Sequence, residues 1–496
     1  MNLGNIASLY FFLPELILIG GILAVVISDI SVKRLRNVLN PLLTVVVLLG
    51  ALYYSVQTEH DVASNLFEGM LALDGFAQYF KVFLLLAAIL VFFGALHSEE
   101  LAPIHQGEFF ALLLAVTLGM VLMVNSIHLT MLYLSLELVS LTSYIMVGYL
   151  RRERLSNEAS MKYILFGTVS TGSMLYGFSL LYGLTGSLNL FEIHEVLLTQ
   201  GVAGFNQFTL LLVVVLTIAG FGFKTAVVPF HFWCPDVYTG APTPVTAFLS
   251  VAPKAAGFGI LVRFFFSGLS ESNGEEWSAI SGINWPLVLI GVSVLTMTLG
   301  NIAALTQTNL KRMLAYSSIA HAGYILMGSV VLTRMGLKAM LVYLFVYLFM
   351  NLGAFLIVTV IFNSEKTFEI QDYNGMFRRS PFLATAMSIF MLSLIGIPPF
   401  SGFLGKLYIF GAVIDQGLFW FAVVGALNAA IAAFYYMRVM KHMILENSDG
   451  NNTPLHISYL NRALLVALLV PNIFLIVFWT SIDRWTTSSV MLFRGL

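Results

Sequence analysis

Four ionisable residues lie inside long apolar stretches of the sequence: Glu137, Lys224, Lys254 and Lys406. A charge at the centre of a bilayer costs roughly 2.5–3.5 kcal/mol on insertion scales, so such residues face a bundle interior, pair, or contact water. A desolvated lysine gives up its proton more easily than a lysine in water, whereas arginine stays charged. Together these residue types predict a relay that carries protons across a membrane.

A carboxylate stabilises the charged form of a neighbouring lysine, and moving it away has the opposite effect. Glu137 and Lys224 are therefore expected to form a switch pair. A secondary relay is predicted from four further residues: Lys162, His231, His321 and Tyr324. His321 and Tyr324 share one helical face with Ser317, and histidine titrates near physiological pH.

Alternatives stay open for some of these side chains. Lys162 could equally extend toward the membrane surface, and His231 could satisfy backbone groups freed by Pro229. Lys81 and Arg263 lie near the ends of apolar stretches and are expected to reach the surface in this way.

The composition places the chain in a bilayer. Of 496 residues, 59% are hydrophobic and 10% charged, and the mean hydropathy is +0.90. A single cysteine, Cys234, excludes a disulfide framework and any iron–sulfur cluster or cysteine-rich zinc site built by this chain alone. No glycine-rich nucleotide fingerprint or phosphate loop follows a strand, so we expect no cofactor and no metal here.

Apolar runs long enough to span a hydrocarbon core of about 30 Å recur along almost the whole chain, and they predict an all-α fold. We expect about fourteen transmembrane helices, two of them broken, at Pro229 and at Pro398-Pro399. The first begins without a basic region or cleavage site and is expected to be retained. The spans are approximately 11–28, 41–57, 76–97, 108–124, 127–149, 159–183, 207–231, 243–268, 285–306, 311–332, 337–361, 381–411, 417–440 and 463–481.

The basic residues predict the orientation of these spans. The loops after odd-numbered spans hold fourteen Lys and Arg, from Lys33 and Arg34 to Arg462, and the other side holds four: Arg334, Lys338, Arg484 and Arg494. Basic loops stay cytoplasmic, so both termini are expected outside, in a bacterial inner membrane.

Part of the sequence repeats. Gly220-Phe-Gly-Phe-Lys224 resembles Gly402-Phe-Leu-Gly-Lys406, with lysines 182 positions apart (406 − 224), and Met131-Leu132 and Met313-Leu314 have the same offset (313 − 131). Spans four to eight are therefore expected to recur as spans nine to thirteen. An odd number of helices inverts the second copy, and inverted repeats with broken helices are typical of transporters. The chain is predicted to divide into four units. These are helices one to three (1–100), the first repeat (101–270), the second repeat (280–445) and helix fourteen (446–496).

Two stretches carry a family resemblance. Residues 229–250, beginning Pro-Phe-His-Phe-Trp-Cys-Pro-Asp, and residues 307–324, from Gln-Thr-Asn-Leu-Lys-Arg to His-Ala-Gly-Tyr, resemble the antiporter-like subunits of proton-pumping NADH:quinone oxidoreductase, respiratory complex I. Within that family, Trp233-Cys-Pro-Asp-Val-Tyr238 and Ser401-Gly-Phe-Leu-Gly-Lys406 are most similar to subunit N.

The resemblance implies fourteen helices, with Glu137 and Lys224 as the switch pair, Lys254 as the connecting residue and Lys406 as the gate to the far side. It implies that the chain couples quinone reduction to proton transfer while FMN, iron–sulfur clusters and quinone bind partner subunits. The implied partners are the neighbouring antiporter-like subunit, the small quinone-proximal subunits and the bilayer.

Two other functions remain possible from the sequence. A subunit of a multisubunit cation/proton antiporter would share the fold and the charged residues. A membrane enzyme or quinone-binding subunit would need a cluster of cofactor residues that the sequence does not contain.

Overall fold

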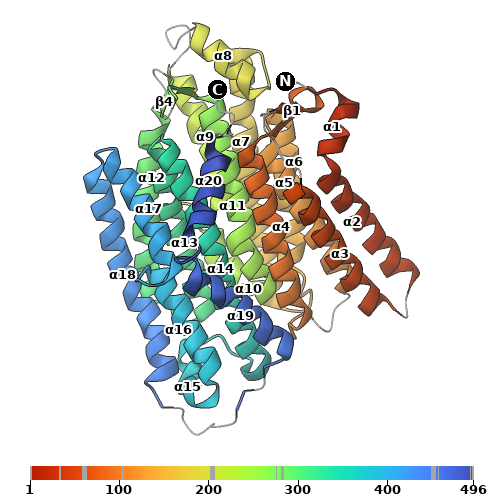
Figure 1. The fold of residues 1–496 in the computed structure, drawn as a ribbon, viewed down its shortest axis with the longest axis vertical. Helices are drawn as coiled ribbons and strands as arrows, with labels where there is room; N and C mark the ends of the chain where they lie inside the picture. Colours follow the sequence, from red (N-terminus) through yellow and green to blue (C-terminus); the bar gives the residue numbers. More distant parts are fainter. Residues whose placement is uncertain are drawn as a thin grey trace.

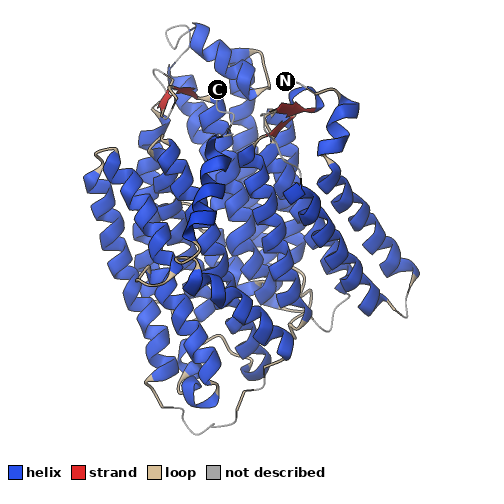
Figure 2. Cartoon of the chain, in the orientation of Figure 1, coloured by secondary structure: helices blue, strands red, loops and turns tan. Residues whose placement is uncertain are grey.

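The protein is described by a computed structural model that covers residues 3–32, 35–57, 64–101, 106–200, 207–274, 276–280, 284–447, 454–455, 457–491 and 493. Lys33, Arg34 and Arg494, which entered the predicted orientation, lie outside these residues. Helices dominate the fold (Figure 2). Strands in the described part form two antiparallel hairpins, β1 (Ser64–Leu66) with β2 (Leu71–Leu73) and β3 (Ser270–Ser272) with β4 (Trp277–Ala279). The predicted all-α membrane class is confirmed.

The helices of the first half are α1 (Asn5–Phe11), α2 (Leu13–Ser31), α3 (Arg36–Gln57), α4 (Gly75–Leu96), α5 (Gln106–Asn125), α6 (Leu129–Val147), α7 (Arg154–Thr185), α8 (Leu190–Gln200), α9 (Gln207–Thr225), α10 (Trp233–Gly240) and α11 (Thr243–Gly268). Those of the second half are α12 (Trp285–Leu305), α13 (Leu310–Val330), α14 (Arg334–Glu365), α15 (Met376–Arg379), α16 (Pro381–Ile395), α17 (Ser401–Asp415), α18 (Phe419–Ile444), α19 (Tyr459–Phe474) and α20 (Trp479–Met491). The described residues also form two 3₁₀ turns, η1 (Phe67–Gly69) and η3 (Ile370–Tyr373).

Eleven described helices are long and apolar enough to span a bilayer, and α19 with α20 would make a twelfth. Two predicted spans miss this standard for different reasons. The span 311–332 forms α13, whose polar face lowers its hydropathy, and the span 381–411 is divided into α16 and α17. The predicted single helix at 463–481 is wrong, because α19 and α20 meet at 87°. The count of fourteen stays a prediction.

Burial identifies the centre of the bundle. The most apolar windows of α11 and α14 are 100% and 94% buried, whereas those of α2 and α3 are about one-third buried. In Figure 1, α2 and α3 stand at one edge, and the first and last described residues lie at the same end of the bundle. We call this end the terminal face and the opposite end the basic face. A side chain on α11 or α14 is thus placed deep among other helices.

The two halves share helix lengths and backbone contacts. α7 and α14 both have 32 residues, and α11 and α18 both have 26. The backbone N–H of Leu129 donates to Leu188 at 2.8 Å, and that of Leu310 donates to Phe368 at 2.7 Å. Matching bridges join His128 to Asn189 and Asn309 to Glu369. These pairs place equivalent residues 180 or 181 positions apart in this part of the fold (309 − 128, 369 − 189).

The broken helices follow a different register. α9 ends at Thr225 and α16 at Ile395, 170 positions apart (395 − 225), although the lysines are 182 apart. Lys224 therefore lies before its break and Lys406 after its break, so the predicted equivalence of the two lysines is wrong. α9 has 19 residues and α16 has 15, so equivalent positions in the two halves do not keep one constant offset in sequence.

Candidate proton path

Lys254 reaches the centre of the molecule from α11. It is buried, and its Nζ donates to the Ser318 backbone carbonyl at 2.9 Å and to Ser318 Oγ at 2.8 Å. No described carboxylate pairs with this amine. A protonated lysine has three N–H donors, so two hydrogen bonds satisfy the neutral amine and leave one donor of the charged form unused. Lys254 can thus exist in either charge state.

The next part of the path lies on one face of α13. The Ser317 and Tyr436 hydroxyls are hydrogen-bonded, and Tyr436 Oη is 3.1 Å from His321 Nε2. The other ring nitrogen, Nδ1, is 2.8 Å from Tyr343 Oη. An imidazole bonded at both nitrogens can accept a proton on one side and release one on the other. The expected face shared by Ser317, His321 and Tyr324 exists in the structure.

Lys406 lies at the far end of this face. Its Nζ donates to the carbonyls of Ile395 at 2.6 Å and Leu394 at 3.2 Å, and it lies 4.9 Å from the centre of the Tyr324 ring. Both carbonyls belong to the last turn of α16. Because the helix breaks there, these two oxygens have no intrahelical hydrogen-bond donor. A Cβ at Gly396, where φ is +87°, would come within 2.7 Å of Lys406 Cδ. The break therefore both supplies the oxygens and leaves space for the lysine.

Tyr324 is held by a second polar group. Asn301 Nδ2 lies 3.3 Å from Tyr324 Oη, and Tyr435 Oη donates to Asn301 Oδ1 at 2.9 Å. His321 and Tyr324 are one turn apart, with ring centres separated by 5.9 Å. From Lys254 to Lys406 the polar side chains thus follow one another along α13.

Lys224 has a different environment. It is buried at the end of α9, its Nζ has no hydrogen-bond partner among the described residues, and the Phe223 and Tyr163 rings lie 5.8 and 6.0 Å away. Glu137 is near enough to act on it electrostatically, but no ion pair joins the two in the described part. The predicted switch pair is close in space without direct contact.

Glu137 is half-buried in this chain, so the expectation of a fully buried glutamate is wrong for the chain alone. The reason is the face of α6 on which it lies. Leu134, Leu141 and Ile145 share this face and are each more than half exposed.

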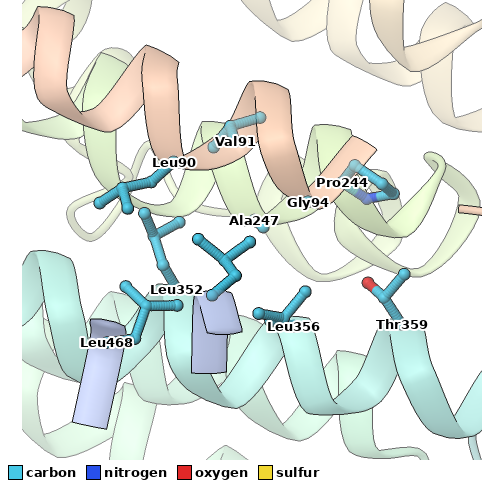
Figure 3. A pocket seen from close by; sticks show the side chains of 10 residues that line it. Leu90, Val91, Gly94, Pro244, Ala247, Leu352, Leu356, Thr359 and Leu468 are labelled. Atoms are coloured by element: carbon cyan, nitrogen blue, oxygen red, sulfur yellow. The ribbon is translucent and has the colours of Figure 1, made fainter. Parts of the chain in front are cut away.

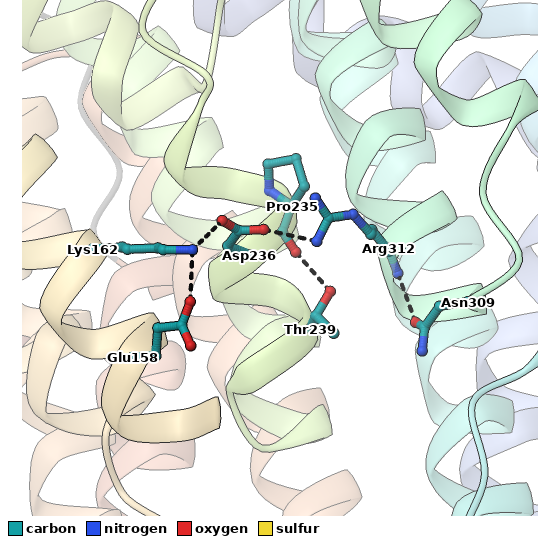
Figure 4. A network of polar contacts seen from close by, with 7 residues as sticks. All are labelled: Glu158, Lys162, Pro235, Asp236, Thr239, Asn309 and Arg312. Atoms are coloured by element: carbon teal, nitrogen blue, oxygen red, sulfur yellow. Dashed lines mark hydrogen bonds and ion pairs between the residues drawn. The ribbon is translucent and has the colours of Figure 1, made fainter. Parts of the chain in front are cut away.

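The structure separates the other candidates from this path. Lys162 is half-exposed and forms ion pairs with Glu158 at 2.8 Å and Asp236 at 2.6 Å (Figure 4). His231 lies between α9 and α10, half-buried, and its Nδ1 has no hydrogen-bond partner among the described residues. In the part of the chain that the structure describes, no hydrogen bond or ion pair joins Lys162 or His231 to the row on α13.

The expectation that Lys81 and Arg263 reach the surface is wrong. Arg263 is fully buried and donates to both carboxylate oxygens of Asp74, one at 2.9 Å. Lys81 is buried and pairs with Glu15 at 2.7 Å. Carboxylates from α2 and from the residue before α4 supply these partners, and sequence position alone does not reveal such contacts between helices.

A sequence profile described as "NADH:quinone oxidoreductase/Mrp antiporter, TM" matches residues 126–432. The NADH-quinone oxidoreductase subunit N of an Anaeromyxobacter species is 43% identical, with 99% of this chain and 98% of that protein covered. The chain belongs to the NADH-quinone oxidoreductase subunit N family. Its membership confirms the predicted resemblance.

Solved structures agree with this family. A chain of respiratory complex I from Thermus thermophilus matches at a TM-score of 0.77 and 29% identity, covering 95% of this chain and 98% of that one. A chain of the Mrp complex from a Dietzia species matches at a TM-score of 0.81 and 20% identity, with 97% of each chain covered, and shows a shared fold. The row of polar residues on α13 lies within the matched family region.

Sequence reasoning missed several members of the path, namely Ser318, Tyr343, Tyr435 and Asn301, and gave Tyr436 no role. Hydroxyl and amide side chains within apolar spans were the available signal, but most such groups simply bond to a carbonyl one turn earlier. Tyr343 and Tyr436 come from α14 and α18, so their meeting at His321 depends on packing.

Other features of the structure carry less chemistry. An apolar pocket between α4, α11, α14 and α19 is lined by ten residues, of which five are leucines and none is ionisable (Figure 3). Among the described residues, no group of three His, Cys, Asp or Glu side chains could hold a metal ion.

Proposed function

We propose that the chain is the proton-translocating membrane subunit of an NADH:quinone oxidoreductase of the translocase class (EC 7.1.1.-). The observation that carries this proposal is the polar row from Lys254 to Lys406 in the buried centre of the molecule. Buried polar groups in a membrane protein are expensive, and titratable ones arranged in sequence are typical of proton relays.

In this proposal Glu137, Lys224, Lys254 and Lys406 carry the protons, and His321 and Tyr324 connect the last two. Lys224 responds to Glu137 through space. Lys254 passes a proton toward Ser318, and His321, which is hydrogen-bonded to Tyr436 and Tyr343, relays it. Lys406 then releases it on the side of α17. Lys162, on α7, and His231, just before α10, lie apart from the row on α13. In this proposal they serve the relay near α7 and α10.

The redox chemistry belongs to other subunits in this proposal. FMN, iron–sulfur clusters and quinone bind there, and their reactions change the charge state of this chain from a distance. The exposed face of α6 supports a neighbouring subunit, because a half-buried Glu137 among exposed leucines is costly against lipid. We place the complex in a bacterial inner membrane, with both termini on the non-cytoplasmic side.

Proton pumping by the whole complex tests the proposal. Complexes with Lys224→Ala or Lys406→Ala are reconstituted in vesicles, and NADH oxidation and acidification are measured after assembly is verified. Lys441→Ala is a matched control, since Lys441 is 59% exposed and pairs with Glu446. Loss of pumping in the first two variants with normal assembly is expected. Wild-type pumping in both variants would overturn the proposal. If the chain copurifies with membrane subunits that do not oxidise NADH, the assembly is an antiporter instead.

A further inference from the structure

The C-terminal helices α19 and α20 lie against the broken helix that carries Lys406. α19 packs on α14, α16 and α17, and α20 packs on α14 and α4. In Figure 1 this pair crosses the front of the bundle, with α19 beside α16 and α20 running toward the end where the chain terminates. The pair belongs to the predicted unit 446–496, outside both repeats, so its contacts with the break are the guide to its role.

Asn472 of α19 is fully buried at the break and contacts both half-helices. Its Nδ2 donates to the carbonyl of Leu468 at 2.9 Å. This carbonyl can only accept, so the side-chain oxygen of Asn472 faces the other way. That oxygen accepts from Ser393 Oγ of α16 at 2.9 Å and from Ser401 Oγ of α17 at 3.2 Å. One amide oxygen therefore joins the end of α16 to the beginning of α17.

Ser393 makes a second connection across the break. Its hydroxyl accepts the backbone N–H of Gly402, in the first turn of α17, at 3.1 Å. The N–H groups of a first turn have no intrahelical partner, so Ser393 caps α17 from another helix. A Cβ at Gly402 would overlap the Ser393 carbonyl, so the two half-helices touch through their backbones. Asn472 thus binds the break at a point where the backbones already meet.

These contacts surround the groups that bind Lys406. The two carbonyls that accept from its Nζ belong to the residues that directly follow Ser393, and Lys406 itself lies five positions after Ser401 (406 − 401). A shift of one half-helix against the other therefore changes the distance between the amine and these oxygens. No hydrogen bond joins Asn472 to Lys406 in the described part of the chain, so Asn472 acts on the lysine through the half-helices.

A second contact holds α17 beyond its lysine. Tyr408 Oη donates to Asp483 Oδ1 at 2.8 Å and accepts from Trp479 Nε1 at 2.8 Å. Trp479 and Asp483 are one turn apart on α20, and Asp483 also pairs with Lys338 of α14 at 2.7 Å. The lysine of α17 thus lies between two attachments to the same C-terminal pair.

We infer that Asn472 is a positioning residue for Lys406. By holding Ser393 and Ser401, it sets the separation between the α16 carbonyls and the α17 amine. Hydrogen bonds to the charged form of a group favour that form, so this separation governs how readily the amine takes up and releases a proton. Asn472 transfers no proton itself. The inference rests on the proposed role of Lys406 in proton transfer.

The experiment compares Asn472→Leu, Ser401→Ala and Asn461→Leu in the reconstituted complex. Leucine is similar in shape to asparagine but accepts no hydrogen bond, and Ser401→Ala removes only the contact with α17. Asn461 is a buried asparagine on the same helix whose side-chain oxygen has no hydrogen-bond partner among the described residues, and it serves as the matched control. The measurements are the amount of assembled complex, its melting temperature, NADH oxidation and the rate of acidification across a range of pH.

Asn472→Leu is expected to lower the pumping rate per assembled complex by about fivefold to tenfold, the scale of one or two lost neutral hydrogen bonds. The pH profile of the remaining pumping should also shift, by about half a unit or more, which corresponds to a change of about threefold in proton binding. Ser401→Ala should give a smaller loss with a shifted profile. Combining it with Asn472→Leu should add little, because both changes remove the same contact. Asn461→Leu should leave the rate and the profile unchanged.

A wild-type rate and pH profile in Asn472→Leu would overturn the inference, and so would a loss that only follows reduced assembly or melting temperature. If Asn472→Leu does not assemble, the rate and profile of Ser401→Ala decide in the same way. If Lys406→Ala abolishes pumping while both of these variants pump like the wild type, the inference fails and the proposed function stands. Normal pumping by Lys406→Ala would instead remove the proposed role of the lysine itself.

Discussion

Five buried cations of this chain lie in two regions and have different partners there. Near the terminal face, Arg263 and Lys81 each contact a buried carboxylate, Asp74 or Glu15. In the centre, Lys254 and Lys406 donate hydrogen bonds to hydroxyl and carbonyl oxygens and have no carboxylate partner in the described part, and Lys224 has no hydrogen-bond partner there.

This difference separates fixed charges from charges that can change. A buried ion pair holds both partners ionised, because neutralising one leaves the other unpaired at low dielectric. A lysine that donates to neutral oxygens keeps those bonds as a neutral amine. In the proposed function, the paired cations Arg263 and Lys81 therefore serve the fold, and Lys224, Lys254 and Lys406 serve transport.

Breaking a fixed pair should have the largest effect on the fold. Arg263→Met leaves Asp74 buried without its cation, and removal of one partner of a buried pair costs about 3–5 kcal/mol. We expect little assembled complex, measured by native electrophoresis of detergent-solubilised membranes. The complex that does assemble should pump normally, and normal assembly of this variant would contradict a structural role.

Removing an unpaired lysine should have the opposite effect. Lys254→Met deletes an amine bound only by Ser318, and methionine fits the same apolar surroundings. We expect assembly near the wild-type level and a fall in pumping of about tenfold or more, equal to about 1.4 kcal/mol or more in the barrier. Acidification of reconstituted vesicles measures it. Poor assembly with normal pumping per complex would place Lys254 with the fixed charges.

Interrupting the row between the lysines tests whether it conducts. His321→Phe removes both ring nitrogens while keeping an aromatic ring beside Tyr347, whose ring centre is 5.0 Å away. We expect a pumping loss of about tenfold, since acid–base groups contribute at least this much. His321→Gln, which keeps hydrogen-bonding groups, is the control and should lose less. Equal pumping in both variants and the wild type would exclude His321 from the path.

Removing one hydroxyl beside His321 should have a smaller effect. Tyr436→Phe deletes the contact at Nε2 and the hydrogen bond to Ser317, while Tyr343 remains at Nδ1. Only the first of these bonds orients His321, and a single neutral hydrogen bond is worth about 1 kcal/mol, so pumping should fall by about fivefold or less. The rate is measured as for His321→Phe. A loss as large as that of His321→Phe would mean that Tyr436 itself transfers the proton.

Replacing both partners of a fixed pair should have the smallest effect. Apolar replacement of a buried pair is often neutral or stabilising, so Lys81→Met with Glu15→Leu should change stability little. Pumping and the melting temperature of the complex are the measurements. A strong loss of pumping in a normally assembled double variant would move this pair into the transport group.

Much of the fold could be predicted from the sequence. Long apolar runs identified most of the helices, and Pro229 and Pro398-Pro399 identified the interrupted ones. Apolar runs alone do not identify a span whose helix has a polar face, as in α13. They also do not predict a sharp bend, such as the one between α19 and α20.

The candidate site was predicted in part. The types of Lys224, Lys254, Lys406 and His321 were sufficient to select them, since such side chains are costly in apolar spans. The same criterion could not separate Arg263, which is paired, from the lysines, which are not.

The sequence by itself determined that the protein lies in a lipid bilayer, that its segments have a helical period, and which side chains can titrate. Only the tertiary structure decided which carboxylate meets which cation and which side of a helix break each ionisable residue occupies. Helical periodicity is set by neighbours within a turn or two. Contacts between α7, α10 and α13, or between α13, α14 and α18, depend on how helices distant in sequence pack and on loop lengths that shift one half against the other.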